Sequence, residues 1–215
     1  MVEIDSVQAY CLMGPPGAGK TTQMQCLASA LPYSARLSVG ALLRDAAADG
    51  RLGAKQTQEI NDGIFIADEL FLALFSDSLF AKLRCSLDRN LETAVLLIEG
   101  MPRTEKQVCW LDDNLEYWRL ILLEAPDEVL RQRLMRRRSA QQGTYRLTSS
   151  RTYVPVRECR ADDRPSVIER RLRKYRQDVY HLLAAMDRQK IVVDATLPPT
   201  DVTHVIISSI ARAQT

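Results

Sequence analysis

The chain has 215 residues, a length that suits one α/β domain with a sizeable core. Its hydrophobic content of 46% and charged content of 26% are those of an ordinary globular protein, and a net charge of +2 gives no case for nucleic acid or an anionic membrane as partner. No apolar run approaches the roughly 20 residues that span a bilayer. The five cysteines form no C-x-x-C pair, so we expect neither a zinc site nor a disulfide framework, and a reducing, cytoplasmic location.

A glycine-rich stretch is the strongest local signal in the chain. Residues 14–21 read Gly-Pro-Pro-Gly-Ala-Gly-Lys-Thr and fit the phosphate-binding loop pattern G-x-x-x-x-G-K-[ST] at every fixed position. The apolar run 7–13 before this loop predicts a buried strand, and the apolar spacing over 21–31 predicts a helix after it. Inward-pointing N–H groups, a helix N-terminus and the mobile charge of Lys20 together predict binding of a nucleoside triphosphate.

The rest of the chain alternates between predicted helices and strands. Further strands are expected over 36–39, 94–98, 119–123 and 190–194, and helices over 41–48, 54–61, 66–83, 104–112, from 126, over 162–186 and over 200–213. This alternation predicts a P-loop three-layer α/β fold, with a parallel sheet of about five strands covered by helices on both faces. Residues 38–84 form a helical interruption, and the polar, weakly periodic residues 139–160 are typical of a lid of medium length. We expect both to be subregions of a single domain, 1–215.

Charged residues follow several predicted strands. Glu99 ends the strand 94–98, where a P-loop fold carries the carboxylate that orders Mg²⁺. Arginines recur at the ends of elements, and a cleft that holds two nucleotides needs them, because two unit charges about 4 Å apart repel by roughly 4 kcal/mol at an effective dielectric near 20. Surface arginines without a ligand are the alternative interpretation. The arginines in question are Arg44, Arg103, Arg133, Arg137, Arg160 and Arg171.

Ordered motifs along nearly the whole chain resemble those of nucleoside monophosphate kinases of the adenylate kinase family. The loop 14–23 resembles the family's P-loop, 38–44 its acceptor-binding segment, and 63–70 the turn after that segment. Glu99-Gly-Met-Pro-Arg-Thr104 with Gln107 resembles the family signature D-G-F-P-R-T and its adenine-reading glutamine. Residues 160–163 and 170–172 resemble the segment that closes the lid.

The resemblance implies roles on the ATP side of the site. The loop and the first helical turn would hold the donor phosphates through Gly17, Ala18, Gly19, Lys20, Thr21 and Thr22. Arg133 would stack on the donor adenine, and Arg137 would reach its phosphates. Mg²⁺, the implied cofactor, would arrive with ATP and contact Thr21 and Glu99 through water, without a direct protein ligand.

It also implies an acceptor side. The acceptor phosphate would be held by Arg44 and Arg103, and Gln107 would hydrogen-bond the base. The pocket would further involve Val39, Ile64, Phe65, Ile66, Gly100 and Phe71. Arg160 and Arg171 would arrive on lid closure, with Asp162 in the closing network. Lys20, Arg103, Arg137, Arg160 and Arg171 would be the catalytic set of a cytoplasmic monomer that binds ATP and a nucleoside monophosphate, but neither nucleic acid nor a membrane.

Departures from the family pattern leave two alternatives open. The leading hypothesis is ATP + AMP ⇌ 2 ADP. Val39 stands where adenylate kinases usually carry Thr, and this apolar residue favours a UMP/CMP or broad-specificity kinase instead. Glu99 replaces the usual Asp and Met101 the usual Phe, which motivates a catalytically weak nucleotide sensor or assembly module. The lid lacks the four metal-ligand positions of the zinc-bearing type, so no structural zinc is expected.

Overall fold

The computed structural model describes residues 7–31, 34–62, 64–87, 95–142, 164–186 and 190–212. Its centre is a five-stranded sheet in which neighbouring strands are parallel, with the order β2-β3-β1-β4-β5. The strands are β1 (Gln8–Met13), β2 (Ser34–Ser38), β3 (Val95–Glu99), β4 (Tyr117–Glu124) and β5 (Lys190–Asp194). Parallel neighbours need crossover connections, and helices supply them. The predicted five-stranded parallel α/β fold is therefore confirmed.

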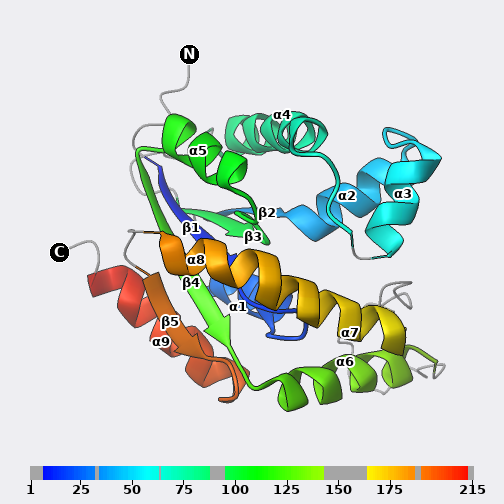
Figure 1. Cartoon of the computed structure of the whole chain (residues 1–215). Coiled ribbons are helices and arrows are strands. Elements are labelled where there is room, and N and C mark those ends of the chain that lie inside the picture. The colour runs from blue at the N-terminus through cyan, green and yellow to red at the C-terminus, as the bar shows by residue number, and fades with distance from the viewer. Residues whose placement is uncertain are drawn as a thin grey trace, which may run out of the picture.

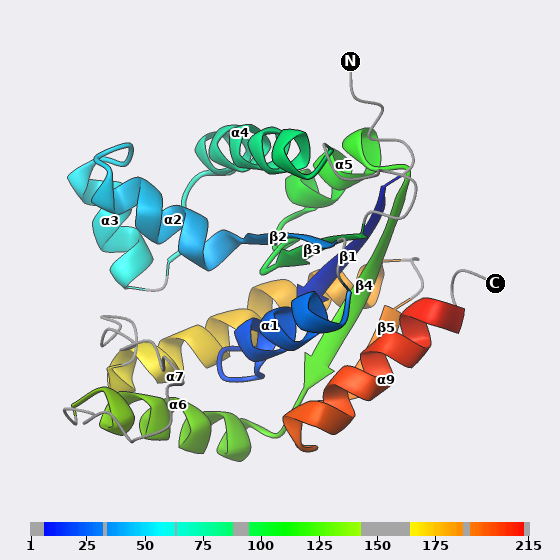
Figure 2. The same ribbon diagram turned by 180° about the vertical axis from the view of Figure 1, so that it is seen from behind.

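Helices cover both faces of this sheet (Figures 1 and 2). They are α1 (Lys20–Ala30), α2 (Val39–Ala48), α3 (Ala54–Asn61), α4 (Asp68–Leu87), α5 (Glu105–Asn114), α6 (Asp127–Gln142), α7 (Pro165–Lys174), the π-helical turn η4 (Tyr175–Val179), α8 (Tyr180–Ala185) and α9 (Pro199–Arg212). In Figure 2, α1 and α9 lie in front of the sheet, whereas Figure 1 shows α4, α5 and α8 on the side turned to the viewer.

Alternating strand side chains divide the buried residues into two cores. Along β1, Cys11 belongs to the core under α4, α5 and α8, whereas Leu12 belongs to the core under α1 and α9. The period of two that places successive side chains on opposite faces explains this division. The apolar stripe of α4 fills the first core with Phe71, Phe75 and their neighbours, as expected for a core helix.

The segment 165–185 changes face along its length. Ile168 and Leu172 of α7 pack in the core under α1 and α9, whereas Tyr175, Val179 and Leu183 pack in the opposite core. Between them, η4 has the i→i+5 pattern of a π-turn, which advances the helix by one extra residue. The sequence predicted one uninterrupted helix over 162–186, whereas the structure has a π-turn within it, at the point where the buried side chains pass from one core to the other.

Most other element bounds agree with the predictions to within a few residues. The expected strand 36–39 is an exception, because β2 ends at Ser38 and Val39 is already the first residue of α2. Val39 is buried in the core rather than in the sheet. The expected helix 162–186 begins at residues that lie outside the described part of the chain, and α7 begins at Pro165 with Arg164 at the N-cap position.

Candidate functional site

The phosphate-binding loop joins the end of β1 to the start of α1 at the carboxyl edge of the sheet. Gly17 has a φ of +87°, in the left-handed region that favours glycine, and a Cβ there would lie 3.0 Å from the carbonyl oxygen of Leu130 in α6. A larger residue would push α6 away from the loop. The predicted residues Ala18 and Gly19 complete the loop, and Lys20, Thr21 and Thr22 form the first turn of α1.

Lys20 lies against the loop. Its Nζ donates hydrogen bonds to the carbonyl oxygens of Gly14 and Pro15, at 2.7 and 2.9 Å. Burial is the main cause that lowers the pKa of Lys20 from 10.5 to about 7; Glu99 opposes it, and the cations Arg103, Arg171 and Arg137 add to it. The fold therefore brings three of the predicted arginines, from three different elements, close enough to act on this ammonium group. Such a concentration of positive charge favours an anionic ligand.

Glu99 ends β3 beside the loop. Its Oε1 accepts a hydrogen bond from the Thr21 hydroxyl at 2.8 Å, whereas Oε2 is buried and has no hydrogen-bond partner among the described residues. Within that same part of the chain, no group of three His, Cys, Asp or Glu side chains could hold a metal ion. Mg²⁺ prefers oxygen ligands and keeps several waters when it travels with a nucleotide. A carboxylate with one unsatisfied oxygen beside a hydroxyl fits an ion held mainly by phosphates and water.

Arg103 follows β3 through a tight turn. Its Nε donates to the carbonyl oxygen of Gly100 at 2.7 Å, and its guanidinium lies 4.9 Å from the centre of the Phe65 ring. A Cβ at Gly100, whose φ is +90°, would lie 3.2 Å from Arg103 Nη2 and 3.6 Å from the Val39 Cβ. Burial and the nearby Arg171 lower the pKa of Arg103 to about 10. Close packing around Gly100 therefore holds this cation near Val39.

The side chain of Gln107 is almost fully buried, with 5% of the residue exposed. Its Oε1 accepts from the Arg103 backbone N–H at 2.8 Å, and its Nε2 donates to Asp68 Oδ1 at 2.8 Å. The Thr104 hydroxyl accepts from the Gln107 N–H as the cap of α5 and donates to the same Asp68 oxygen at 3.0 Å. Gln107, which the sequence predicted as a base-binding residue, is thus held by hydrogen bonds to Arg103, Thr104 and Asp68.

The other predicted residues are less closely grouped. Arg133 lies on α6 and acts electrostatically on Asp194 at the end of β5, whose pKa is lowered mainly by hydrogen bonds from Thr196. Arg44 is exposed on α2, and its Nη1 lies 3.2 Å from the position of a Cβ on Gly40. Arg160 and Asp162 lie outside the described residues.

The apolar residues expected around the acceptor base differ in exposure. Val39, Ile66 and Phe71 are buried in the core, whereas Ile64 is 43% exposed. Two cations lie close to the Phe65 ring, because Lys174 Nζ stands 5.1 Å from its centre, in addition to Arg103. Sequence reasoning did not single out Lys174, since no motif marks it, and only the packing of η4 and α7 against the turn at Phe65 reveals the contact.

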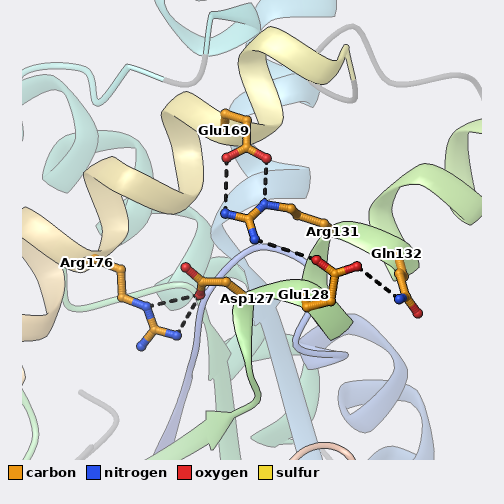
Figure 3. Close-up of polar contacts among 6 residues, drawn as sticks. All are labelled: Asp127, Glu128, Arg131, Gln132, Glu169 and Arg176. Atoms are coloured by element: carbon orange, nitrogen blue, oxygen red, sulfur yellow. Dashed lines mark hydrogen bonds and ion pairs between the residues drawn. The ribbon is translucent and has the colours of Figure 1, made fainter.

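Carboxylates and arginines join α6 to α7, through Glu169, and to η4, through Arg176, as Figure 3 shows. The Arg131 guanidinium contacts both Glu169 oxygens, with Nε at 2.7 Å, and Arg176 donates to Asp127 at 2.8 Å. Because α6 carries Arg137 and α7 carries Arg171, these ion pairs fix the two helices from which those cations act on Lys20. We call this set of contacts the α6–α7 seam.

A family model for adenylate kinases matches residues 12–191 of this chain. The chain belongs to the adenylate kinase family. Its relatives include the adenylate kinase of Sorangium cellulosum, 30% identical over 214 residues that cover 94% of this chain and 95% of the relative. The adenylate kinase of Thermus thermophilus is 30% identical over 207 residues, 93% and 95% of the two chains, and that of Chlamydia felis is 33% identical over 179 residues, 78% and 79%.

Family membership makes this adenylate kinase homologue an enzyme that transfers a phosphoryl group to a nucleoside monophosphate. The order of elements agrees with that activity, because the P-loop, Glu99 and the arginines acting on Lys20 all lie at the carboxyl edge of the sheet, where open α/β sheets bind ligands. In the part of the chain that the structure describes, no helix is both long and apolar enough to cross a membrane.

Proposed function

We propose that this enzyme catalyses ATP + AMP ⇌ 2 ADP with Mg²⁺ as cofactor. The observation that carries the proposal is the convergence of Arg103, Arg137 and Arg171 on Lys20 beside a complete phosphate-binding loop. Two nucleotides brought end to end crowd their phosphates together, and fixed cations offset the repulsion. Adenine as the acceptor base is supported by the buried, fixed amide of Gln107.

The proposed roles follow from the position of each group. Lys20 and the N–H groups of the loop hold the donor phosphates, Arg137 acts on the same phosphates, and Arg103 holds the acceptor phosphate. Arg171 stabilises the transferring group, together with Arg160. Thr21 and Glu99 would hold Mg²⁺ through water, and the ion would supply positive charge to the phosphates. The transfer is direct and in line, so no protein nucleophile is required.

Residues 38–84, which contain α2, α3 and most of α4, are proposed as the acceptor-binding subregion, and 139–160 as the lid. Arg44 of α2 is proposed as a second contact to the acceptor phosphate, with Phe65 and Ile66 near the base. On the donor side, Arg133 is proposed to stack on the adenine. Closure of the lid would exclude water, which otherwise competes as phosphoryl acceptor.

A coupled assay with AMP, UMP, CMP and GMP at saturating MgATP tests the acceptor. We expect the highest kcat/KM with AMP, and comparable or better turnover of UMP or CMP would overturn the assignment. The variant Lys20→Ala tests whether this lysine takes part in phosphoryl transfer, and we expect kcat to fall by several powers of ten. A wild type that binds ATP and yet transfers nothing would instead support the nucleotide-sensor hypothesis.

A second candidate, a UMP/CMP or broad-specificity kinase, is supported by Val39. This residue is buried beside Gly100 and offers no hydroxyl to a base. On this hypothesis, Val39→Thr adds a polar contact and increases the preference for AMP, because polar groups discriminate between bases better than apolar ones. An unchanged ratio of AMP to UMP turnover in this variant would contradict it.

A further inference from the structure

The orientation of the Gln107 amide is determined by its partners. A backbone N–H can only donate, so the atom facing the Arg103 N–H at 2.8 Å has to be the amide oxygen. An ionised carboxylate can only accept, so the atom facing Asp68 at 2.8 Å has to be the amide nitrogen. Both ends of the amide therefore require the same orientation, and each contact excludes the flipped one.

Asp68 is itself held in place for this contact. It begins α4, and its Oδ1 accepts a second hydrogen bond from the Thr104 hydroxyl at 3.0 Å. That hydroxyl also accepts from the Gln107 N–H as the α5 cap, so its proton is directed to Asp68. Rotating the amide by half a turn would bring its oxygen against a carboxylate oxygen and its NH₂ against an N–H group, inside a site that water barely reaches.

We propose that Asp68 is a positioning residue that locks the Gln107 amide so that the acceptor site accepts a 6-aminopurine and rejects a 6-oxopurine. This inference rests on the proposed function, in which Gln107 reads the acceptor base. After these contacts, the amide retains one N–H and one oxygen lone pair. An adenine complements them, because its N1 accepts from the N–H and its 6-amino group donates to the oxygen.

A hypoxanthine base presents the opposite pattern at the same two positions. Its 6-oxygen would face the locked amide oxygen, and its N1–H would face the locked N–H. A freely rotating amide would turn over and satisfy this base equally well. The fixed amide therefore predicts that IMP meets two repulsive contacts, rather than merely lacking a favourable one. This discrimination depends on Asp68, which need not contact the acceptor.

The first experiment uses the wild-type enzyme and three acceptors of nearly equal size: AMP, purine riboside 5′-monophosphate and IMP. The unsubstituted purine retains the N1 acceptor and has nothing at position 6. With a locked amide, kcat/KM falls in the order AMP, purine riboside monophosphate, IMP, with IMP below the unsubstituted purine by about tenfold or more. IMP equal to or better than the unsubstituted purine would overturn the lock.

The second experiment uses Asp68→Ala, which removes the oxygen that accepts from both the Gln107 amide and the Thr104 hydroxyl. Only the Arg103 N–H then holds the amide, so we expect the AMP-to-IMP ratio of kcat/KM to fall about tenfold, chiefly through the KM of the acceptor, with the KM of ATP unchanged. The matched control is Glu69→Ala, which removes a carboxylate from the next residue, an exposed partner of Lys106. Its ratio should stay at the wild-type value.

The outcomes separate this inference from the proposed function. If the wild type turns over no AMP, the proposed function fails, and the lock with it. If AMP is the best acceptor but Asp68→Ala lowers AMP and IMP turnover by the same factor, Asp68 is merely structural and the inference alone fails. Should that variant not fold, as judged by its thermal transition, the three-acceptor series with the wild type still tests whether the amide is fixed, and IMP equal to or better than the unsubstituted purine would overturn the inference.

Discussion

Two groups of arginines in this molecule differ in what surrounds them. In the α6–α7 seam, Arg131 and Arg176 lie on carboxylates at hydrogen-bonding distance, and their side chains are more than a third exposed. Around Lys20, the cations Arg103, Arg137 and Arg171 lower the pKa of a half-buried ammonium group, with Glu99 as the opposing carboxylate. Arginines thus pair with carboxylates in the seam, whereas around Lys20 three of them act on another cation.

The difference indicates what each group is for. Exposed ion pairs between helices contribute little to stability but fix geometry when the contact is bidentate. Like charges gathered in a partly buried site repel one another, and an anionic ligand offsets that repulsion. The seam therefore orients the helices that carry Arg137 and Arg171, whereas the cations around Lys20 favour an anionic ligand, as the proposed function requires.

The largest effect is expected at Arg171. Arg171→Ala removes a cation from the group around Lys20, and we expect kcat to fall on the order of 10³-fold, as when an arginine that stabilises a transferring phosphoryl is lost. The control is Arg173→Ala on the same helix, since Arg173 is exposed. Steady-state kinetics measure kcat for both variants. An equal fall in kcat for Arg173→Ala would contradict a specific role for Arg171.

The next largest effect is expected in the pH dependence of MgATP binding. In the free protein, burial and the neighbouring arginines lower the pKa of Lys20 to about 7, and bound phosphates should raise it again. The complex then binds more protons than the free enzyme above pH 7, so the Kd of MgATP rises with pH, by up to about tenfold per unit.

Calorimetry of MgATP binding in buffers of different ionisation enthalpy measures the accompanying proton uptake. The variant Lys20→Met, which cannot titrate, corrects for protons released by ATP itself. Proton uptake that is the same in Lys20→Met and in the wild type would exclude Lys20 as the titrating group.

A smaller effect is expected in the seam. Arg176→Met retains an apolar stem beside Tyr180 but loses the contact with Asp127, and we expect about 1 kcal/mol or less of stability to be lost. Denaturant unfolding measures this change. A fall in kcat to the level of Arg171→Ala would show that the seam does more than orient helices.

The smallest effect is expected at a third contact, where Asp62 after α3 lies 3.6 Å from Arg164 and 3.5 Å from Arg170. These distances are longer than those in the seam, so Asp62→Asn should change the KM of the acceptor by no more than about twofold, and only at low salt. The control Asp49→Asn removes a carboxylate that pairs locally with Arg51. A salt-independent change would indicate a structural role for Asp62 instead.

The sequence predicted those features that depend on short, contiguous patterns. The phosphate-binding loop, the parallel sheet, the helix 54–61 and the strand 190–194 all follow from local spacing, and the structure contains them. Glu99 was expected at a strand end for the same reason. Contacts between distant segments were not predictable in this way, because Asp68 and Gln107, or Phe65 and Lys174, meet only after the helices have packed.

The exceptions have physical reasons too. Val39 is β-branched and continues an apolar run, so propensity favoured the strand, but its burial against Gly100 favours the helix. The turn η4 left no signal in the periodicity, since one additional residue in a helix changes the apolar spacing by less than the pattern normally varies. Tertiary packing decided both positions.

The π-turn η4 has a consequence for how the protein unfolds. Because α7 is anchored on one side of the sheet and α8 on the other, the two layers share one continuous rod. Neither core can unfold without removing the segment 165–185 from the other. Heating should therefore unfold both cores in one cooperative transition rather than in two stages.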